Sequence, residues 1–351
     1  MCETVKTPQG RLIEVSDAVG TVLAHDITEV RPGECKGACF KKGHKVTDND
    51  VPHLARLGKR HLYILNIDPD MMHEDEAAVV LANALAGLGI IFNPEPSEGK
   101  INLIAAYDGL LKVEVQTLTD FNLVEGLMCA SRHTNTLVRK GEVVAGTRAI
   151  PLVISREAVA KGASIAEAAG GVFAVKHLAH PKTGMIVTGQ EVYDGLIQDK
   201  FVPAIRPKLE SYECPILKIV FAPDDADFIA QAIHSLISEG AELIVATGGL
   251  SVDPDDVTRT GVMKAGAQEL IYGSAVLPGA MVLISQVGSV PVIGIPACGM
   301  YHHNTVFDLI LPRVLAGEKL TRSDLASLGH GGLCLNCEVC RFPTCPFGKS
   351  I

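Results

Sequence analysis

The stretch that decides the fold reads Ala246-Thr247-Gly248-Gly249-Leu250-Ser251-Val252-Asp253-Pro254-Asp255-Asp256-Val257-Thr258. It follows an apolar strand expected over residues 242–245 and leads into an expected helix. Adjacent glycines allow a backbone to approach a ligand closely, and the start of a helix offers N–H groups to an anion. The stretch therefore predicts a phosphate-binding turn at the end of a strand.

Two carboxylates complicate this turn. Asp255 and Asp256 would repel a phosphate unless they hold a divalent metal ion or orient a reacting group. In the simpler interpretation, Asp256 only caps the helix and the glycines only form a strand-to-helix turn. The turn by itself supports both interpretations equally.

Three further strand ends carry similar turns. Residues 185–191 end in Thr188 and Gly189, residues 220–225 end in Pro223-Asp224-Asp225, and residues 292–300 contain Pro296. In an open parallel sheet, loops at the carboxyl ends of neighbouring strands converge on one crevice. We therefore expect the four turns to form one shared site.

The order and spacing of these motifs resemble the molybdopterin-binding domain of molybdenum cofactor biosynthesis proteins. That domain is shared by MogA-type molybdopterin adenylyltransferases, MoeA-type molybdopterin molybdotransferases and the competence-damage protein CinA. The resemblance covers about residues 181–317, a suitable length for one doubly wound domain. It implies an α/β fold with a three-layer, mostly parallel sheet. The motifs that carry it are Thr188-Gly189 with Asp199, Pro223-Asp224-Asp225, Thr247-Gly248-Gly249 with Ser251, and Asp256-Val257-Thr258.

The resemblance also implies the ligands and the site residues. The crevice would bind molybdopterin or its adenylated form, together with Mg²⁺. Asp224 and Asp256 are the candidate catalytic residues, which would position the ion or polarise the reacting group. The candidate cofactor-binding residues are Thr188, Gly189, Thr247, Gly248, Gly249, Ser251, Pro278, Gly279 and Pro296.

Several details resemble the MoeA type. Residues 248–252 resemble its GGVSV motif, whereas the MogA pattern has glycine at the position of Ser251, and residues 37–65 resemble an N-terminal segment of MoeA-like proteins. One departure concerns the MoeA motif KPGKP. Here the chain keeps the turn Pro278-Gly279 but has neither lysine. Loss of both cations argues against molybdate insertion.

A cysteine-rich tail is the second strong signal. Cys334, Cys337, Cys340 and Cys345 follow the spacing C-x2-C-x2-C-x4-C-P, and such short gaps allow four thiolates to meet at one metal centre. The spacing is close to the bacterial ferredoxin run, with one extra residue, and also fits a zinc knuckle. The alternatives are two disulfides or four free thiols, although the polar N-terminus gives no secretory signal. We expect an iron–sulfur cluster or zinc.

Isolated residues give weaker signals. Arg148 is either a phosphate contact or an exposed arginine at a strand edge. Cys35, Cys39 and His44 could ligate a metal but lack a fourth ligand. Cys298 lies in the predicted crevice, where it could touch a ligand or simply pack as a small residue.

Composition and charge limit the function classes. The chain has 351 residues, 47% of them hydrophobic, and a net charge of −9. Its apolar runs are too short to span a bilayer, and the negative charge argues against nucleic acid or an anionic membrane as partner. We expect a cytoplasmic homo-oligomer whose partners are the pterin ligand and either molybdoenzymes or other cofactor-biosynthesis proteins.

The predicted organisation has four parts. Local patterns predict helices over residues 48–57, 74–86, 122–130 and 227–237, and strands within residues 136–154. Asp108-Gly109 predicts a β-hairpin between residues 103–107 and 110–115. The parts are a MoeA-like α+β segment (residues 1–66), a small mixed α+β domain (67–180), the molybdopterin-binding α/β domain (181–317) and the cysteine-rich tail (318–351).

Three functions follow from these expectations. The first is an enzyme of cofactor maturation, of the molybdotransferase or adenylyltransferase kind. The second is a carrier, sensor or insertion chaperone that binds the cofactor without converting it, which the loss of the lysines favours. The third is a CinA-like hydrolase of pyridine nucleotides.

Overall fold

The computed structural model describes residues 11–21, 23–31, 35–41, 44, 46–64, 68–251, 253 and 256–349. Its chain divides into two compact units. Unit 1 comprises Met1–Ala106, Val113–Arg132 and Lys140–Ala174, and unit 2 comprises Tyr107–Lys112, His133–Arg139 and Val175–Ile351. Both units are thus assembled from segments that are separate in the sequence.

Within the described residues, the main sheet of unit 2 has six strands in the order β15-β14-β16-β19-β18-β17. β14 pairs in parallel with β15 and β16, and β16 pairs in parallel with β19. β18 and β17 extend the sheet in antiparallel pairing. The prediction of a mostly parallel α/β fold is confirmed. The strands span Thr183–Thr188 (β14), Ile216–Ala222 (β15), Leu243–Thr247 (β16), Leu270–Tyr272 (β17), Leu283–Val287 (β18) and Val290–Ile295 (β19).

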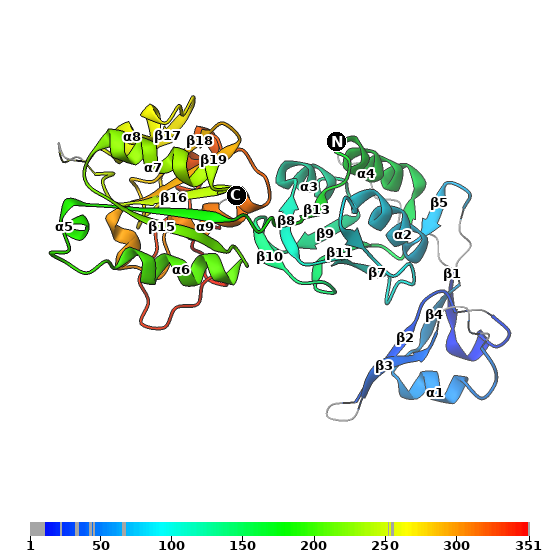
Figure 1. The fold of residues 1–351 in the computed structure, drawn as a ribbon. Helices are drawn as coiled ribbons and strands as arrows, with labels where there is room; N and C mark the ends of the chain where they lie inside the picture. Colours follow the sequence, from blue (N-terminus) through cyan, green and yellow to red (C-terminus); the bar gives the residue numbers. More distant parts are fainter. Residues whose placement is uncertain are drawn as a thin grey trace. The chain divides into compact units, whose positions relative to one another are not determined.

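Helices cover both faces of this sheet. Successive side chains of a strand point to opposite faces, so Met185 and Val245 pack with α6, α9 and α10, whereas Ile186 and Ile244 pack with α7 and α8. In Figure 1, α7 and α8 lie above β15 and β16, and α6 lies below them. The result is a three-layer arrangement. The helices are α5 (Gln190–Tyr193), α6 (Phe201–Ser211), α7 (Ala226–Ser238), α8 (Thr258–Lys264), α9 (Val306–Leu315) and α10 (Arg322–Ser327), with the 3-10 helix η2 (Ala297–Met300).

The C-terminal tail is docked on unit 2. The backbone N–H of Cys334 donates to the carbonyl of Leu277 at 2.8 Å, and Leu277 donates to Gly332 at 2.8 Å. Phe347 is buried in the same core as α9, which anchors the far end of the tail. Unit 2 also contains most of a second sheet, β10-β8-β13, formed by Thr136–Val138, Gly109–Val113 and Phe173–Lys176.

The N-terminal segment of unit 1 is the predicted α+β region. β1 (Arg11–Glu14) pairs with β4 (His61–Ile64), and β2 (Ile27–Arg31) pairs with β3 (Cys35–Phe40). The 3-10 helix η1 (Val15–Asp17) and helix α1 (Val51–Arg56) complete it. Its core includes Ile27, Phe40 and Leu54.

The rest of unit 1 mixes helices and short strands. One sheet has the order β6-β7-β11-β9, and β5 pairs with β12. Helix α2 packs against α4 and β11. The elements are β5 (Met71–His73), α2 (Glu74–Leu85), β6 (Ile90–Ile91), β7 (Lys100–Ala105), α3 (Val115–Asn122), β9 (Leu127–Ser131), β11 (Val143–Ala149), β12 (Val153–Ser155) and α4 (Arg156–Ala168).

Two local predictions in this region are wrong. The expected hairpin around Asp108-Gly109 does not form, because β7 pairs with β6 and β11 whereas β8 pairs with β10 and β13. The helix expected over residues 122–130 is replaced by the end of α3 and by strand β9. In β9, Leu127 and Cys129 are buried and their neighbours are exposed, which is the alternation of a strand.

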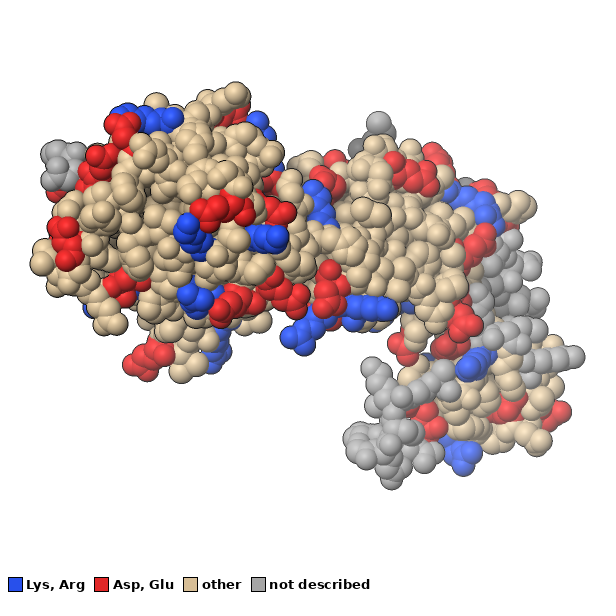
Figure 2. Space-filling view, viewed as in Figure 1, with Lys and Arg blue, Asp and Glu red and all other residues tan. Residues whose placement is uncertain are grey.

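Charges of both signs are mixed on the surface. On the face drawn in Figure 2, lysine and arginine side chains lie next to acidic ones rather than gathering in one basic area. Among the residues that the structure describes, no helix has both the length and the apolar character needed to cross a membrane.

Candidate functional site

A cavity of about 610 Å³ opens at the carboxyl ends of the parallel strands of unit 2. It collects residues from the turns after β14, β15, β16 and β19, so those four turns do meet at one place. Five of the residues predicted from the sequence line it: Thr188, Gly189, Asp224, Gly249 and Asp256. We call this cavity the crevice.

Buried hydroxyl groups support the floor of the crevice. Thr188 Oγ1 donates to the carbonyl of Thr247 at 2.9 Å and lies 3.0 Å from Oγ1 of Thr258. Thr247 and Thr258 are fully buried, and Thr188 is 3% exposed. These hydrogen bonds tie the ends of β14 and β16 to the start of α8.

The two glycines of the turn are required by the fold itself. Gly248 has φ +82° and Gly249 has φ +57°, both in the left-handed region that other residues rarely adopt. A Cβ on Gly249 would lie 2.4 Å from Oγ1 of Thr258, and a Cβ on Gly248 would lie 2.7 Å from the carbonyl of Thr188. The glycines therefore let the turn pack onto the threonines, which is a structural reason for them besides ligand approach.

The backbone N–H groups of this turn are partly used within the protein. Gly248 donates to the carbonyl of Ile295 at 3.2 Å, and Thr258 donates to the carbonyl of Gly249 at 3.2 Å. The first N–H of α8 therefore points to the turn and not to a ligand. An anion in the crevice would need other partners.

Asp256 lies in the crevice but does not cap α8. The N-cap position is Val257, and no side chain caps this helix. Oδ2 of Asp256 instead accepts from the backbone N–H of Asp253 at 3.2 Å. Asp255 and Val252, which also belong to the turn, lie outside the described residues.

Asp224 joins two strand ends. Its Oδ2 accepts from the backbone N–H of Gln190 at 2.9 Å, which links the turn after β15 to the start of α5 after β14. The neighbouring Asp225 caps α7 by accepting from Asp227 and Phe228. Of the two acids at this strand end, Asp224 is therefore the one that faces the crevice.

The lining of the crevice is acidic. Four carboxylates and one lysine, Lys200, are found among the described residues that line it. Oxygen ligands of this kind suit Mg²⁺, and a phosphate would be repelled here without a cation. The remaining residues of the lining were not predicted: Gln190, Glu191, Val192, Ile197, Gln198, Lys200, Phe201, Asp253, Met300 and Tyr301.

Most of these additional residues come from one segment. Residues 190–201 connect β14 to α6, and the sequence there carried no sign of which side chains would turn inward. Asp199 holds the start of α6 by accepting from Phe201 and Val202 at 2.8 and 3.0 Å. A polar stretch directly after a predicted parallel strand would have been the available signal.

Four predicted residues support the crevice or lie beside it. Thr247 and Pro296 are buried, Ser251 is exposed, and Gly248 is held by its hydrogen bond to Ile295. Cys298 lies in η2, where burial raises the pKa of its thiol.

Pro278 and Gly279 take part in a different contact, with the start of α9. The carbonyl of Pro278 accepts from Val306 at 3.1 Å, and a Cβ on Gly279 would lie 2.5 Å from Cγ1 of Val306. This turn packs against the start of α9, and the preceding Leu277 holds the tail. Neither Pro278 nor Gly279 lines the crevice.

The four tail cysteines are free thiols in the structure. Cys337 and Cys340 are exposed, whereas Cys334 and Cys345 pack against the core of unit 2. All four belong to the described residues, and no three of their sulfur atoms lie within 4.8 Å of one another. Contacts of His302 with Asn336 (3.1 Å) and of Asn304 with Cys340 (2.9 Å) hold the tail against the loop that follows Tyr301.

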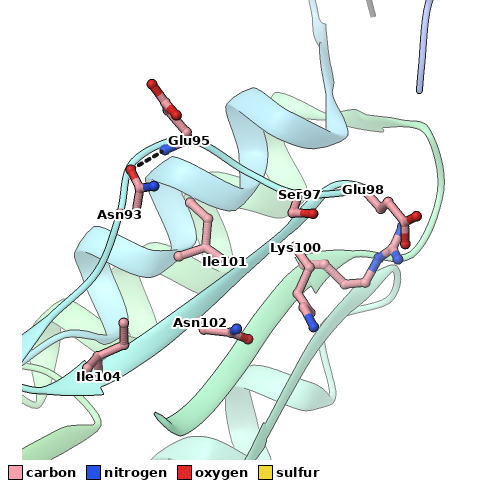
Figure 3. A pocket seen from close by; sticks show the side chains of 9 residues that line it. Asn93, Glu95, Ser97, Glu98, Lys100, Ile101, Asn102 and Ile104 are labelled. Carbon is pink, nitrogen blue, oxygen red and sulfur yellow. Dashed lines mark hydrogen bonds between the residues drawn. The ribbon is translucent and has the colours of Figure 1, made fainter. Parts of the chain in front are cut away.

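A second cavity, of about 410 Å³, lies in unit 1. Lys100 and Asn102 project into it from the same side of β7 (Figure 3). Arg148 also lines this cavity, and its Nη2 donates to Oε2 of Glu74 at 2.7 Å. Arg148 is therefore engaged in an ion pair within unit 1 and does not line the crevice.

Comparison with known families identifies the domain that contains the crevice. Residues 184–316 match the family described as the probable molybdopterin binding domain, which confirms the resemblance seen in the sequence. Residues 12–66 match a domain of unknown function, DUF8806. The chain therefore contains a probable molybdopterin-binding domain preceded by a domain without an assigned role.

Individual proteins are similar to a part of this chain. A CinA-like protein of Mycobacterium sp. (strain JLS) is 36% identical over 90 residues, which make up 26% of this chain and 21% of that protein. The structure of CinA from Thermoplasma acidophilum is 19% identical, with a TM-score of 0.35 over 39% of this chain and 98% of that one. The structure of MoaB from Thermus thermophilus is 18% identical, with a TM-score of 0.34 over 40% of this chain and 99% of that one. The matched segment spans about a fifth of the CinA-like relative.

Proposed function

We propose that the crevice binds molybdopterin or its adenylated form, and that the protein takes part in the maturation or delivery of the molybdenum cofactor. The observation that carries this proposal is the meeting of Thr188, Gly189, Asp224, Gly249 and Asp256 around one cavity in a probable molybdopterin-binding domain. The volume of about 610 Å³ falls within the range of about 300–1,000 Å³ that is usual for small-molecule sites.

Mg²⁺ would join the ligand phosphate to the acidic lining. Glu191, Asp224, Asp253 and Asp256 supply oxygen donors, yet no three carboxylates of the described lining lie within 4.8 Å of one another. This suits an ion that binds through one or two carboxylates, water and the substrate phosphates. When bound, Mg²⁺ would neutralise the phosphate charge, and Asp224 and Asp256 would hold it in place.

Aromatic and apolar residues also line the crevice. Tyr301 is 70% exposed and lines the crevice beside Met300, so its ring is available to stack on a flat pterin. Phe201 closes the wall and is 6% exposed.

A carrier or delivery role is favoured over molybdate insertion. Lys200 is the one cation found among the described residues of the lining. The turn at Pro278-Gly279, where MoeA-type proteins carry two lysines, packs against α9 next to the segment that binds the tail. A molybdotransferase-like or adenylyltransferase-like activity would need cations supplied by the ligand-bound metal.

A second candidate is a CinA-like hydrolase of pyridine nucleotides, which the local identity of 36% to a CinA-like protein supports. Adenylated molybdopterin and pyridine dinucleotides share a pyrophosphate, so the same acids and Mg²⁺ would serve either ligand.

Calorimetry with molybdopterin and with its adenylated form, each with and without Mg²⁺, tests the site. We expect Mg²⁺-dependent binding that weakens in Asp256→Asn and Asp224→Asn. The matched control is Glu213→Gln, an exposed carboxylate that precedes β15 and thus lies at the amino end of the sheet. Equal affinity in all three variants would place the ligand elsewhere.

Assays of turnover then distinguish a carrier from a transferase and from a hydrolase. Incubation of the ligand-loaded protein with ATP and molybdate should give no new product if the protein is a carrier. Formation of molybdenum cofactor or of adenylated molybdopterin would identify a transferase. Hydrolysis of pyridine dinucleotides without pterin binding would favour the CinA-like alternative.

A further inference from the structure

A thiol, an imidazole and a carboxylate meet in the N-terminal segment of unit 1. Cys39 comes from β3, His53 from α1 and Glu29 from β2, and their donor atoms lie within 4.8 Å of one another. Within the part of the chain that the structure describes, no other group of three histidine, cysteine, aspartate or glutamate residues has this spacing. The group falls in the domain of unknown function.

The distances between the donor atoms are those of metal ligands. Sγ of Cys39 lies 3.4 Å from Nε2 and 3.9 Å from Nδ1 of His53, and Oε2 of Glu29 lies 3.6 Å from Nε2. With bonds of about 2.0–2.3 Å in tetrahedral geometry, the ligand atoms of zinc are about 3.4–3.6 Å apart. One ion can reach all three atoms once the His53 ring turns so that the lone pair of Nε2 points between the sulfur and the carboxylate oxygen.

Hydrogen bonding alone explains this arrangement less well. Sγ of Cys39 lies at similar distances from both ring nitrogens of His53, so it is not aligned with the lone pair or N–H of either one, as a good hydrogen bond requires. The separation of 3.6 Å from Glu29 is also too long for a good hydrogen bond. A cation between the three atoms would accept an electron pair from each of them.

The backbone places Cys39 by an irregularity in the β2–β3 pair. Ile27 pairs with Phe40 and Thr28 pairs with Ala38, so Cys39 is the extra residue of a bulge. Bulges redirect a side chain and are frequent next to functional sites.

The position of His53 is also fixed. The ring of Phe40, which is buried, packs edge-on against the His53 ring with centroids 5.1 Å apart. Before α1, Oδ2 of Asp50 accepts from Thr47 N–H at 2.8 Å and contacts Nε2 of His44 at 2.7 Å. The turn that begins α1 is therefore held, and His44 is engaged with Asp50 and not with Cys39.

We propose that Glu29, Cys39 and His53 bind one zinc ion through three protein ligands, with the fourth position open to water or to an external ligand. The combination of thiolate, imidazole and carboxylate favours zinc over Mg²⁺ or Ca²⁺, which prefer oxygen ligands alone. Three protein ligands are typical of zinc sites that act on a bound molecule, whereas structural sites have four. The N-terminal domain would then hold a metal centre distinct from both the crevice and the tail.

The test measures metal content in the full chain, with the tail weakened so that its thiols do not dominate. Cys337→Ser with Cys340→Ser removes two exposed tail thiols and is the parent for all variants. After growth with zinc and dialysis, we expect the parent to retain one zinc per chain and His53→Ala or Glu29→Gln to lose it. His61→Ala, an exposed histidine on β4, is the matched control and should keep the ion.

Cobalt substitution identifies the ligands directly. Co²⁺ in the parent should show a thiolate-to-metal charge-transfer band together with visible d–d absorption. Cys39→Ser should abolish the charge-transfer band and leave d–d absorption from the imidazole and carboxylate. This readout reports on Cys39 even if His53→Ala disturbs the fold. A parent that retains no zinc and gives no thiolate band, or a Cys39→Ser variant whose band is unchanged, would overturn the proposal.

Discussion

The side-chain amide of Asn304 donates a hydrogen bond to Sγ of Cys340, with 2.9 Å between nitrogen and sulfur. Asn304 follows Tyr301 by three residues, and Tyr301 lines the crevice. The cysteine-rich tail therefore touches the loop that leads away from the candidate ligand site.

We predict that the tail binds one metal centre through Cys334, Cys337, Cys340 and Cys345. Four thiolates this close in sequence are stabilised by a cation, and the exposed pair Cys337 and Cys340 can move toward the other two. Anaerobically purified protein should contain iron with acid-labile sulfide, or zinc, and Cys337→Ser should release it. Zinc without iron would exclude an electron-transfer cluster. A metal-free tail whose four cysteine thiols are all titratable would contradict the prediction.

The same metal should influence the crevice. Because Cys340 contacts Asn304, metal binding by the tail should change the affinity for the pterin ligand, and Asn304→Ala should reduce this effect. Calorimetry on the metal-loaded and metal-free forms of both proteins would measure it. Identical affinities in all four samples would mean that tail and crevice act independently.

Tyr301→Ala should weaken pterin binding without loss of stability. The ring is 70% exposed, so its removal costs little packing, whereas loss of stacking is worth about 0.5–1.5 kcal/mol, or about 2- to 13-fold in affinity. Tyr193→Ala is the matched control, because Tyr193 is 46% exposed, packs against Phe228 and does not line the crevice. Equal affinities of the two variants would argue against stacking.

Gly249→Ala should destabilise unit 2. The left-handed backbone costs about 1–2 kcal/mol for alanine, and the new Cβ would also lie 2.4 Å from Oγ1 of the buried Thr258. Gly195→Ala has a similar φ of +72° with no atom within 4 Å of the Cβ, so it should show the backbone cost alone. Urea unfolding of both variants measures the difference. An equally small loss of stability in both variants would show that the turn can move away from Thr258.

An ion-pair cluster near α10 should make stability depend on pH. Burial raises the pKa of Asp324, but hydrogen bonds from Thr321 and the Arg313 guanidinium outweigh it and lower the pKa to about 2. Because the ordinary value is 3.8, the stabilisation is complete above about pH 4 and is lost as the pH falls through about 2. Asp324→Asn should cost up to about 2 kcal/mol at pH 7 and less as the pH falls.

Urea unfolding of the wild type and of Asp324→Asn at pH 7 and near pH 3 would measure this dependence. Glu269→Gln breaks an exposed pair with Lys319 and should change stability by less than about 1 kcal/mol at either pH. A loss of stability in Asp324→Asn that is as large near pH 3 as at pH 7 would mean that the charge of the carboxylate does not stabilise the fold.

The sequence was sufficient to predict the structure where the local pattern and the fold agree. Apolar strands such as Thr183–Thr188 are buried on both faces and end in polar turns, so both the parallel sheet and the position of the crevice could be predicted. The helix over residues 227–237 was found for the same reason, because its apolar side repeats with helical period.

The sequence was insufficient to predict contacts between residues that are far apart in the chain. Asp108-Gly109 is a strong local hairpin signal, but β7 and β8 each form better pairs with strands elsewhere in the chain. Likewise, the sequence grouped Cys39 with Cys35 and His44 as possible metal ligands and missed Glu29 and His53, which reach Cys39 only through the β2–β3 bulge and the placement of α1. The sequence suggested that Asp256 caps α8, but Asp256 lies two positions before the first residue of that helix.

The assembly of unit 2 from separate segments sets an order of events during protein synthesis. Residues 107–112 and 133–139 leave the ribosome well before Val175 and the residues that follow. Strand β8 pairs with β10 on one side but must wait for β13 on the other, so its backbone groups on that side stay unpaired in the nascent chain. A nascent chain that stalls before Val175 would expose this edge, which makes it a natural binding place for a chaperone until the last half of the polypeptide arrives.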